Sequence, residues 1–151
     1  MIVIEHANDV AEVRALFEEY AASVGVSLCF QGFDQELAEL PGRYAPPTGC
    51  LLVAREGTRT AGGIALRKID EGIAEMKRLF VRPAYRRTGL GRRLVEALLA
   101  EARALGYVSI KLDTLPSMAT AIALYESLGF RDVPPYTENP IAGARFLELR
   151  L

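Results

Sequence analysis

Histidine and cysteine, which often hold zinc in proteins, are scarce in this chain of 151 residues. There is one histidine, His6, and there are two cysteines, Cys29 and Cys50, in unrelated sequence contexts. No CxxC pair and no run that combines cysteine with histidine is present, so the spacing typical of a structural zinc site is missing. We therefore expect no metal, and we expect two reduced, mostly buried thiols, which fit a cytoplasmic protein.

Long apolar runs and a strong net charge are also missing. No stretch approaches the ~20 apolar residues that cross a membrane. The N-terminus continues into acidic Glu5 and a helical pattern rather than into a signal peptide. The 18 basic and 19 acidic residues leave a net charge of -1, which argues against an extended nucleic acid or an anionic membrane as partner. We expect a cytoplasmic protein with neither partner.

What is present is the pattern of a single α/β domain that covers residues 1–151. Half of the residues are hydrophobic, enough for a core that needs no disulfide. Apolar periodicity, capping residues and turn residues predict the order of the elements. The predicted strands are residues 2–4, 50–55, 60–68, 73–81, 108–113 and 144–149, and the predicted helices lie between Asp9 and Gly25 and over residues 34–40, 91–105 and 116–128.

Connection lengths predict how these elements assemble. Short turns join the three middle strands, which should therefore form an antiparallel meander. The helix between Val81 and Val108 is long enough for a right-handed crossover to a parallel neighbour. We expect a mixed sheet of six to seven strands with about four helices on its two faces. Residues 130–139 are expected to be irregular, and Asp9 with Glu12 is expected to cap the first helix.

A glycine-bearing loop between the fourth strand and the next helix carries the main functional signal. The first N–H groups of a helix have no partners within it, so a strand, a glycine loop and a helix N-terminus together bind phosphate oxygens. Gly89 can adopt a positive φ that directs successive N–H groups into one concavity, and Gly91 lets a ligand approach the backbone closely. The expected phosphate-binding segment comprises Arg86, Arg87, Thr88, Gly89, Leu90, Gly91 and Arg92.

Positive charge is concentrated in the same stretch. Such a segment in a nearly neutral protein suits a compact polyanion. The alternative is a solvated face that carboxylates elsewhere in the protein balance. Between Met76 and Arg93 there are seven basic residues and no acidic residue: Lys77, Arg78, Arg82, Arg86, Arg87, Arg92 and Arg93.

Two other kinds of phosphate site fit this loop less well. The nucleoside-triphosphate pattern GxxxxGK[ST] is absent. Gly89-Leu90-Gly91 begins a dinucleotide fingerprint, but Leu94 stands in place of its third glycine, and the chain does not open with a βαβ unit. Asp113, near the end of the next strand, could bind a ribose, so a dinucleotide-binding domain stays an alternative.

Two motifs resemble those of the GNAT N-acetyltransferases. Arg86-x-x-Gly89-x-Gly91, after a strand that ends Leu-Phe-Val-Arg-Pro, is similar to the acetyl-CoA signature of that family. The segment ALYESLGF, residues 123–130, is similar to its second motif, and the order of elements matches along nearly the whole chain. The resemblance implies an acetyl-CoA-dependent N-acetyltransferase that acts on a primary amine of a small molecule or peptide. It also allows a homodimer, which many relatives form.

The resemblance further implies where the cofactor lies. The pyrophosphate would meet the N–H groups of residues 87–92, and the basic excess would meet the pyrophosphate and the 3′-phosphate. The pantetheine arm would bond to the backbone of the fourth strand, which in this family splays from the next strand to admit the arm. Ser117 stands near the place of a frequent pantetheine-binding asparagine, although a helix cap is the other reading. The strand residues concerned are Leu79, Phe80 and Val81.

Tyr125 and Glu75 are the candidate catalytic residues. The second-motif tyrosine of the family commonly reaches the cofactor sulfur, so Tyr125 is expected to donate to the leaving thiolate. The alternative is a core tyrosine whose hydroxyl bonds to backbone. Glu75 matches by position the base of histone-acetylating members, and its alternatives are a solvent-facing residue or an ion-pair partner of Lys77. The oxyanion donor is expected to be a backbone N–H near residues 79–81.

The acceptor amine cannot be identified from its expected pocket, which mixes aromatic residues with both charge signs. No Ser–His or Cys–His pair suggests a covalent intermediate, so we expect direct transfer in a ternary complex. A non-catalytic acyl-CoA-binding module that has lost the acceptor site is the second hypothesis. The pocket is expected from residues 25–48 and 134–143, with Phe30, Phe33, Arg43, Tyr44, Tyr136, Glu138 and Asn139.

Overall fold

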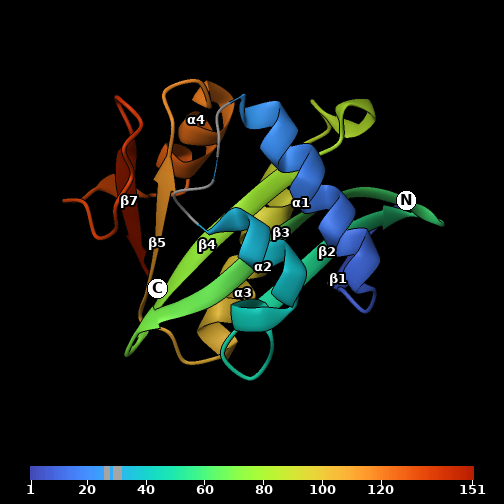
Figure 1. Cartoon of the computed structure of the whole chain (residues 1–151), viewed down its shortest axis with the longest axis horizontal. Helices are drawn as coiled ribbons and strands as arrows, with labels where there is room; N and C mark the ends of the chain where they lie inside the picture. The colour runs from blue at the N-terminus through green and yellow to red at the C-terminus, as the bar shows by residue number, and fades with distance from the viewer. Residues whose placement is uncertain (26–27, 29–31) are drawn as a thin grey trace.

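The computed structural model of this chain describes residues 1–25, 28 and 32–151 (Figure 1). Within these residues, strands and α-helices follow one another in nearly the predicted order. The strands are β1 (Ile2–His6), β2 (Cys50–Glu56), β3 (Arg59–Asp70), β4 (Ile73–Val81), β5 (Ser109–Thr114), β6 (Arg131–Asp132) and β7 (Arg145–Arg150). The helices are α1 (Val10–Val24), α2 (Phe33–Glu39), α3 (Leu90–Ala104) and α4 (Ala119–Ser127), with short 3₁₀ helices η2 (Gly42–Tyr44) and η3 (Pro83–Tyr85).

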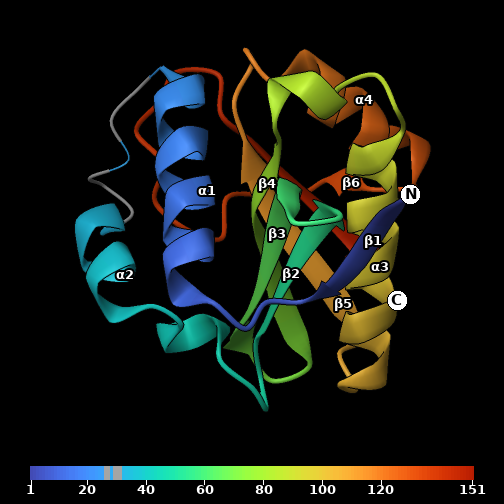
Figure 2. The ribbon, with the colours of Figure 1, turned by 90° about the vertical axis from the view of Figure 1, so that its right-hand side faces the viewer.

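All seven strands belong to one sheet in the order β1-β2-β3-β4-β5-β7-β6. Every neighbouring pair is antiparallel except β4 and β5, which are parallel and are joined by the crossover helix α3. Figure 2 shows α1 and α2 on one face of the sheet and α3 and α4 on the other. The predicted α/β class, the antiparallel meander and the mixed sheet are therefore confirmed.

Two apolar cores lie on the two faces of the sheet. Side chains of a strand point alternately to opposite faces, so Leu52 and Ala54 of β2 pack with α3, whereas Val53 packs with α1. The core beneath α3 is the larger one. From α3 it contains Leu90, Leu94, Val95, Leu98, Leu99 and Ala102.

The C-terminal part of the chain differs from the prediction in two places. Helix α4 begins at Ala119 rather than at Pro116, and its N-cap residue, Met118, makes no side-chain cap. Because Met118 and not Ser117 occupies the N-cap position, the predicted helix-capping role of Ser117 is wrong; Ser117 is exposed in the preceding turn. Residues 130–139 were expected to be irregular, but they contain β6, because β7 offers an open edge on which Arg131 pairs with Glu148.

The N-terminal part shows one correct and one wrong capping prediction. Asp9 caps α1, since its Oδ1 accepts a hydrogen bond from the Ala11 N–H at 3.0 Å. Glu12 does not complete the predicted capping pair, because its carboxylate accepts hydrogen bonds from Arg55 and Thr60 instead.

Two further sequence expectations concern cysteines and membranes. Cys50 is a free, buried thiol as expected, whereas Cys29 lies outside the described residues. In residues 1–25, 28 and 32–151, no helix is both long and apolar enough to cross a membrane.

Leu98 should contribute far more to stability than Leu105, although both are leucines of the α3 segment. Leu98 is fully buried, whereas Leu105 is 41% exposed at the end of the helix. We predict that Leu98→Ala lowers the free energy of unfolding by about 2–5 kcal/mol, and that the control Leu105→Ala changes it by about 0.5 kcal/mol at most. Urea unfolding of both variants measures the difference, and equal losses would contradict the burial of Leu98 beneath α3.

Candidate functional site

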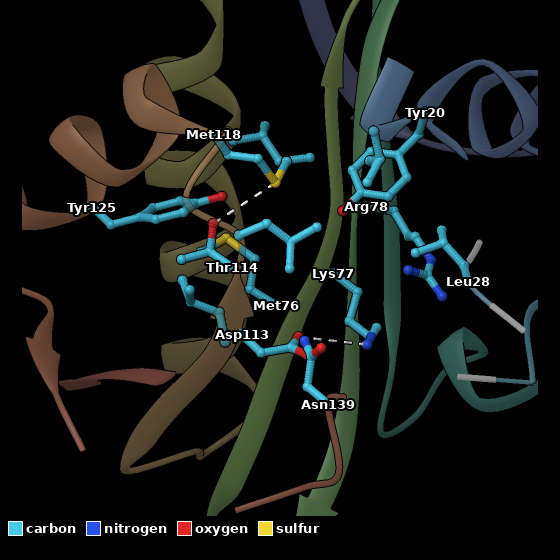
Figure 3. Close-up of a pocket in the computed structure, with 14 residues that line it drawn as sticks. Tyr20, Leu28, Met76, Lys77, Arg78, Asp113, Thr114, Met118, Tyr125 and Asn139 are labelled. Atoms are coloured by element: carbon cyan, nitrogen blue, oxygen red, sulfur yellow. Dashed lines mark hydrogen bonds and ion pairs between the residues drawn. The ribbon is translucent and has the colours of Figure 1, made fainter. Parts of the chain in front are cut away.

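A cleft opens where β4 and β5 diverge. Their parallel pairing covers only Ile73↔Ser109, Ala74↔Ile110 and Glu75↔Lys111, although β4 continues to Val81 and β5 to Thr114. The strands therefore separate, as the family resemblance implied. Figure 3 shows side chains from both strands entering the cleft from its two sides. Its lining consists of Tyr20, Val24, Leu28, Met76, Lys77, Arg78, Leu79, Leu112, Asp113, Thr114, Leu115, Met118, Tyr125 and Asn139.

A β-bulge distorts β4 beside this cleft. Gly63 pairs with Phe80 and Ala65 pairs with Lys77, so two residues of β4, Arg78 and Leu79, stand opposite one residue of β3. Arg78 has a φ of 62°, the left-handed conformation that is unusual for a residue with a side chain. Such a bulge breaks the regular hydrogen-bond ladder and redirects the strand. The bulge thus lies in the segment where the sequence predicted a backbone donor.

The Arg78 side chain is buried on the face that α1 and α2 cover. Its Nε and Nη2 donate to the two carboxylate oxygens of Glu36 at 3.0 and 3.1 Å. The guanidinium also lies 5.1 Å from the ring centre of Phe33 and 5.7 Å from that of Tyr20. This bidentate ion pair fixes α2 against β4.

The basic excess of the sequence is partly neutralised by carboxylates from elsewhere in the chain. Beyond the Arg78–Glu36 pair, Arg82 donates to both carboxylate oxygens of Glu19 at 2.9 and 2.7 Å, and Lys77 lies 3.9 Å from Asp113. The expectation that the whole basic excess meets phosphates is therefore wrong for these three residues. They pair with Glu36, Glu19 and Asp113 because the fold brings those acids beside them.

The loop before α3 has the predicted left-handed backbone. Gly89 has a φ of 80° and Arg87 has a φ of 64°, so two residues of the loop adopt a conformation that directs backbone N–H groups into a concavity. A Cβ at Gly89 would meet nothing within 4 Å, so the space beside it is open. Helix α3 starts directly after it at Leu90. The loop keeps the helix N-terminus accessible to an anion.

Side chains of this loop are anchored to the rest of the fold. Arg86 Nε donates to the Val81 carbonyl at 3.0 Å, and its guanidinium lies 5.8 Å from the ring centre of Phe80. Thr88 Oγ1 donates to the Tyr85 carbonyl at 2.5 Å. Arg92 at the start of α3 donates to Ser127 Oγ at 3.1 Å. The end of β4, the loop and α4 are therefore tied together around the cleft.

Tyr125 presents its hydroxyl to the cleft. The residue is 6% exposed, its ring packs 5.6 Å from that of Phe130, and its hydroxyl points toward Thr114 and Met118 (Figure 3). Within the described part of the chain, no backbone carbonyl accepts a hydrogen bond from this hydroxyl. Burial raises the pKa of Tyr125, so the phenol keeps its proton.

Glu75 lies at the point where the two strands part, but its carboxylate is occupied. It is 1% exposed and accepts hydrogen bonds from Arg67 Nε at 2.8 Å and from the Tyr136 hydroxyl at 2.6 Å. Lys77 Nζ lies 3.9 Å away. Burial raises the pKa of Glu75, but the nearby Lys77 and Arg67 charges outweigh it, and the net shift is downward. This environment matches the predicted alternative of an ion-pair partner for Lys77.

A polar network that the sequence did not indicate bridges the diverging strands. Lys77 of β4 and Asp113 of β5 approach to 3.9 Å, and Asn139 Nδ2 donates to Asp113 Oδ2 at 3.0 Å (Figure 3). Burial lowers the pKa of Lys77. Asp113, considered as a ribose ligand in the dinucleotide alternative, is thus engaged with Lys77 and Asn139. The one sequence feature that indicated part of this network was the i, i+2 spacing of Glu75 and Lys77, which allowed an ion pair.

The residues expected in the acceptor pocket are distributed over two places. Tyr136 and Asn139 reach the cleft region through Glu75 and Asp113, whereas Glu138 is exposed and Phe30 lies outside the described residues. Arg43 donates to the Lys68 carbonyl at 2.9 Å. A second cavity on the α2 side is lined by Gly32, Gln35, Glu36, Glu39, Pro41, Gly42, Arg43, Tyr44 and Arg67.

Comparison with known proteins gives consistent matches. The model of the Acetyltransferase (GNAT) family matches residues 13–130. An uncharacterized N-acetyltransferase of Schizosaccharomyces pombe is 40% identical over 146 residues, covering 95% of this chain and 90% of that protein.

Solved structures with the same fold include a GNAT acetyltransferase of Staphylococcus aureus, with a TM-score of 0.81, 20% identity and 99% coverage of each chain. A Salmonella typhimurium protein solved with its cofactor acetyl-CoA has a TM-score of 0.73 at 25% identity, covering 99% of this chain and 93% of that chain. Since the family match spans most of the chain and the fold agrees, this chain belongs to the GNAT family of acetyltransferases.

Proposed function

We propose that the protein is an acetyl-CoA-dependent N-acetyltransferase that acetylates a primary amine of a small molecule or peptide by direct transfer. The observation that carries this proposal is the cleft between β4 and β5, with a left-handed loop and the N-terminus of α3 at its side. Acetyl-CoA would supply the acyl thioester. We further propose that the protein acts in the cytoplasm as a single domain, and that it can form a homodimer.

The loop and the end of β4 are the proposed cofactor-binding residues. The open space beside Gly89 and the accessible first turn of α3 suit a pyrophosphate, which the N–H groups of residues 87–92 would bind. The diverging end of β4 suits the extended pantetheine arm, since its backbone is unpaired on the β5 side beyond Glu75. We propose Leu79, Phe80 and Val81 as its backbone partners and exposed Ser117 as a further polar contact.

Among the residues that the structure describes, the Tyr125 hydroxyl has no backbone acceptor, which supports a role for this residue at the leaving thiolate. Tyr125 packs in the larger apolar core, and burial raises its pKa, which keeps the phenol protonated at neutral pH. A protonated phenol can donate a hydrogen bond or a proton to a thiolate that develops beside it. We propose this donation as the catalytic contribution of Tyr125.

The surroundings of Glu75 change the role that we propose for it. A base must accept a proton from the amine, but the lowered pKa of Glu75 makes its carboxylate a weak proton acceptor. Arg67, Lys77 and Tyr136 already occupy that carboxylate. We therefore propose that Glu75 is a positioning residue, which holds these three side chains in place, and that loss of water around the amine in the cleft lowers its pKa and favours its neutral form.

The cofactor site can be tested through ligand-induced stabilisation. A ligand that binds only the folded protein stabilises it by mass action, so acetyl-CoA should raise the melting temperature and NAD should not. Gly89→Val forces a branched side chain into a left-handed conformation and should weaken this stabilisation. Gly106→Val is the matched control, because Gly106 has a φ of 90°, nothing within 4 Å of a built Cβ, and a position at the far end of α3.

Turnover with a panel of amino acids, polyamines, aminoglycosides and peptides tests the enzymatic part of the proposal through CoA release. Acetyl-CoA binding without turnover on any amine would favour the non-catalytic module. Stabilisation by NAD alone would favour the dinucleotide-binding domain.

Replacing Tyr125 with phenylalanine should affect chemistry rather than cofactor binding. We predict that Tyr125→Phe lowers kcat by about 100-fold and leaves the acetyl-CoA-dependent rise in melting temperature unchanged. Tyr107→Phe is the control, since its hydroxyl donates to the Thr48 carbonyl away from the cleft. Equal kcat values for wild type and Tyr125→Phe would remove Tyr125 from the mechanism.

A positioning role for Glu75 predicts a loss of stability with an unchanged pH–rate profile. Glu75→Gln leaves buried Lys77 with less compensating charge, so we expect a loss of about 3–5 kcal/mol in the free energy of unfolding. The folded pKa of Glu75 lies below its ordinary value of 4.5. The stabilisation is therefore fully present above that value and is lost as the pH falls toward the lowered pKa.

Glu71→Gln provides the control for this experiment. Glu71 also pairs with a lysine, Lys68, but its side chain is 91% exposed, so its loss should cost about 1 kcal/mol at most. Urea unfolding at neutral and acidic pH measures both variants. A Glu75→Gln enzyme that remains stable but loses the acidic limb of its pH–rate profile would show that Glu75 is the base.

A further inference from the structure

The structure brings together three potential metal ligands that are far apart in the sequence. His6 ends β1, Cys50 begins β2 and Glu101 lies near the end of α3. His6 Nε2 lies 3.1 Å from Glu101 Oε1, and His6 Nδ1 lies 3.9 Å from Cys50 Sγ. One ligand atom from each residue lies within 4.8 Å of the other two. We call these three residues the His6–Cys50–Glu101 cluster.

The fold places the cluster at the edge of the larger core. The antiparallel pairing of β1 with β2 continues to His6↔Leu52, and the Ala7 N–H donates to the Leu51 carbonyl at 2.9 Å, which brings His6 alongside Cys50. Cys50 packs in the core that α3 covers, and Glu101 is a residue of α3, so Glu101 reaches Cys50 from the helix side of the sheet. Cys50 is 3% exposed, whereas the His6 and Glu101 side chains are 64% and 34% exposed.

We propose that the His6–Cys50–Glu101 cluster binds a divalent zinc-type cation. One thiolate, one imidazole and one carboxylate form a ligand set of the kind that zinc accepts, with solvent water as a fourth ligand. Zinc bond lengths of about 2.0–2.3 Å at tetrahedral angles place ligand atoms roughly 3.3–3.6 Å apart. The 3.1 Å and 3.9 Å contacts use different nitrogens of His6, so the applicable limit is the 4.8 Å within which one atom of each residue lies. Rotation of the His6 and Glu101 side chains, which are 64% and 34% exposed, would shorten the separations to the tetrahedral values. Cys50 would release its thiol proton to solvent on binding.

A nucleophilic use of the same residues is less compatible with their environment. The arrangement of a cysteine, a histidine and a carboxylate resembles that of cysteine nucleophiles. However, burial raises the pKa of Cys50 to about 12, and its sulfur is packed into the core rather than exposed to a substrate. A bound cation can compensate for the negative charge of a buried thiolate. Without a cation, the buried Cys50 keeps its proton and is a poor nucleophile.

The cluster is remote from the proposed phosphate-binding loop, and none of its three residues lines the cleft. Glu101 lies eleven residues after Leu90 along α3, which corresponds to about 16 Å of helix. The metal would therefore join β1, β2 and α3 and stabilise the fold without participating in acyl transfer. This role does not depend on the proposed acetyltransferase function.

Co²⁺ and Zn²⁺ titrations of the purified, metal-free full chain test the proposal. We expect Co²⁺ to produce a thiolate-to-metal charge-transfer band in the near ultraviolet, and Zn²⁺ to abolish it by competition. Zn²⁺ at about 100 times Kd should raise the melting temperature by roughly 5–10 °C. Absence of both the band and the thermal shift would overturn the proposal.

Single variants of the three residues identify the ligands. The test does not depend on the buried Cys50 alone, because His6 and Glu101 are also replaced. His6→Ala and Glu101→Ala alter exposed side chains, and each should weaken Co²⁺ binding by more than about 10-fold. Cys50→Ser should abolish the charge-transfer band, which also separates Cys50 from the second thiol, Cys29. Glu18→Ala, which removes an exposed carboxylate of α1, is the control and should bind Co²⁺ like wild type. Unchanged binding in His6→Ala, or a band that persists in Cys50→Ser, would assign the metal to other residues and refute the proposed site.

Discussion

Lys77 of β4 and Asp113 of β5 meet just beyond the last residue pair that joins these strands, and the geometry of the cleft depends on this buried contact. Their side chains are 4% and 7% exposed, so either charge alone would be costly in this environment. Asn139 completes the interactions of Asp113, and Glu75 lies beside Lys77. Polar side chains thus replace backbone pairing at the point where the sheet opens. The separation of the strands is a built feature rather than a frayed end.

The basic segment from Lys77 to Arg93 divides into two parts with different roles. The residues on and just after β4 are paired with acids that α1, α2 and β5 supply. Farther along, Arg86 is bound to a backbone carbonyl and an aromatic ring, and Arg87 adopts the left-handed backbone of the loop. Positive charge in the first part holds layers of the fold together. In the second part, the positive charge lies beside the N-terminus of α3.

Local signals predicted much of this arrangement. The residue range of β4 and the positive φ of Gly89 are determined by short stretches of sequence, and both are confirmed. The separation of β4 from β5 came from the family resemblance, and the structure confirms it. Features that need distant partners were missed. These include the pairing of Arg78 with Glu36, the short strand β6, and the start of α4 after Ser117. The left-handed Arg87 was missed because its side chain gives no local indication of that backbone.

The same limit explains the His6–Cys50–Glu101 cluster. A search for ligands at short sequence spacing finds nothing, since 44 residues separate His6 from Cys50 and 95 separate it from Glu101. The strand pairing and the packing of α3 bring them together only after folding. A metal site of this kind is created by the topology of the fold, so it cannot be recognised from the composition or the spacing of the sequence.

Arg78 meets two demands at once, a left-handed backbone and a bidentate ion pair with Glu36. Its left-handed backbone costs about 1 kcal/mol relative to a relaxed strand residue, and a glycine would remove that cost. A glycine would, however, leave the buried carboxylate of Glu36 without its bidentate partner, which is the larger penalty. Asparagine and aspartate tolerate the backbone but lack the reach and the charge of the guanidinium. Substitution at this position is therefore constrained twice, by conformation and by electrostatics, and the ion pair of Arg78 with Glu36 of α2 fixes the contour of β4 beside the cleft.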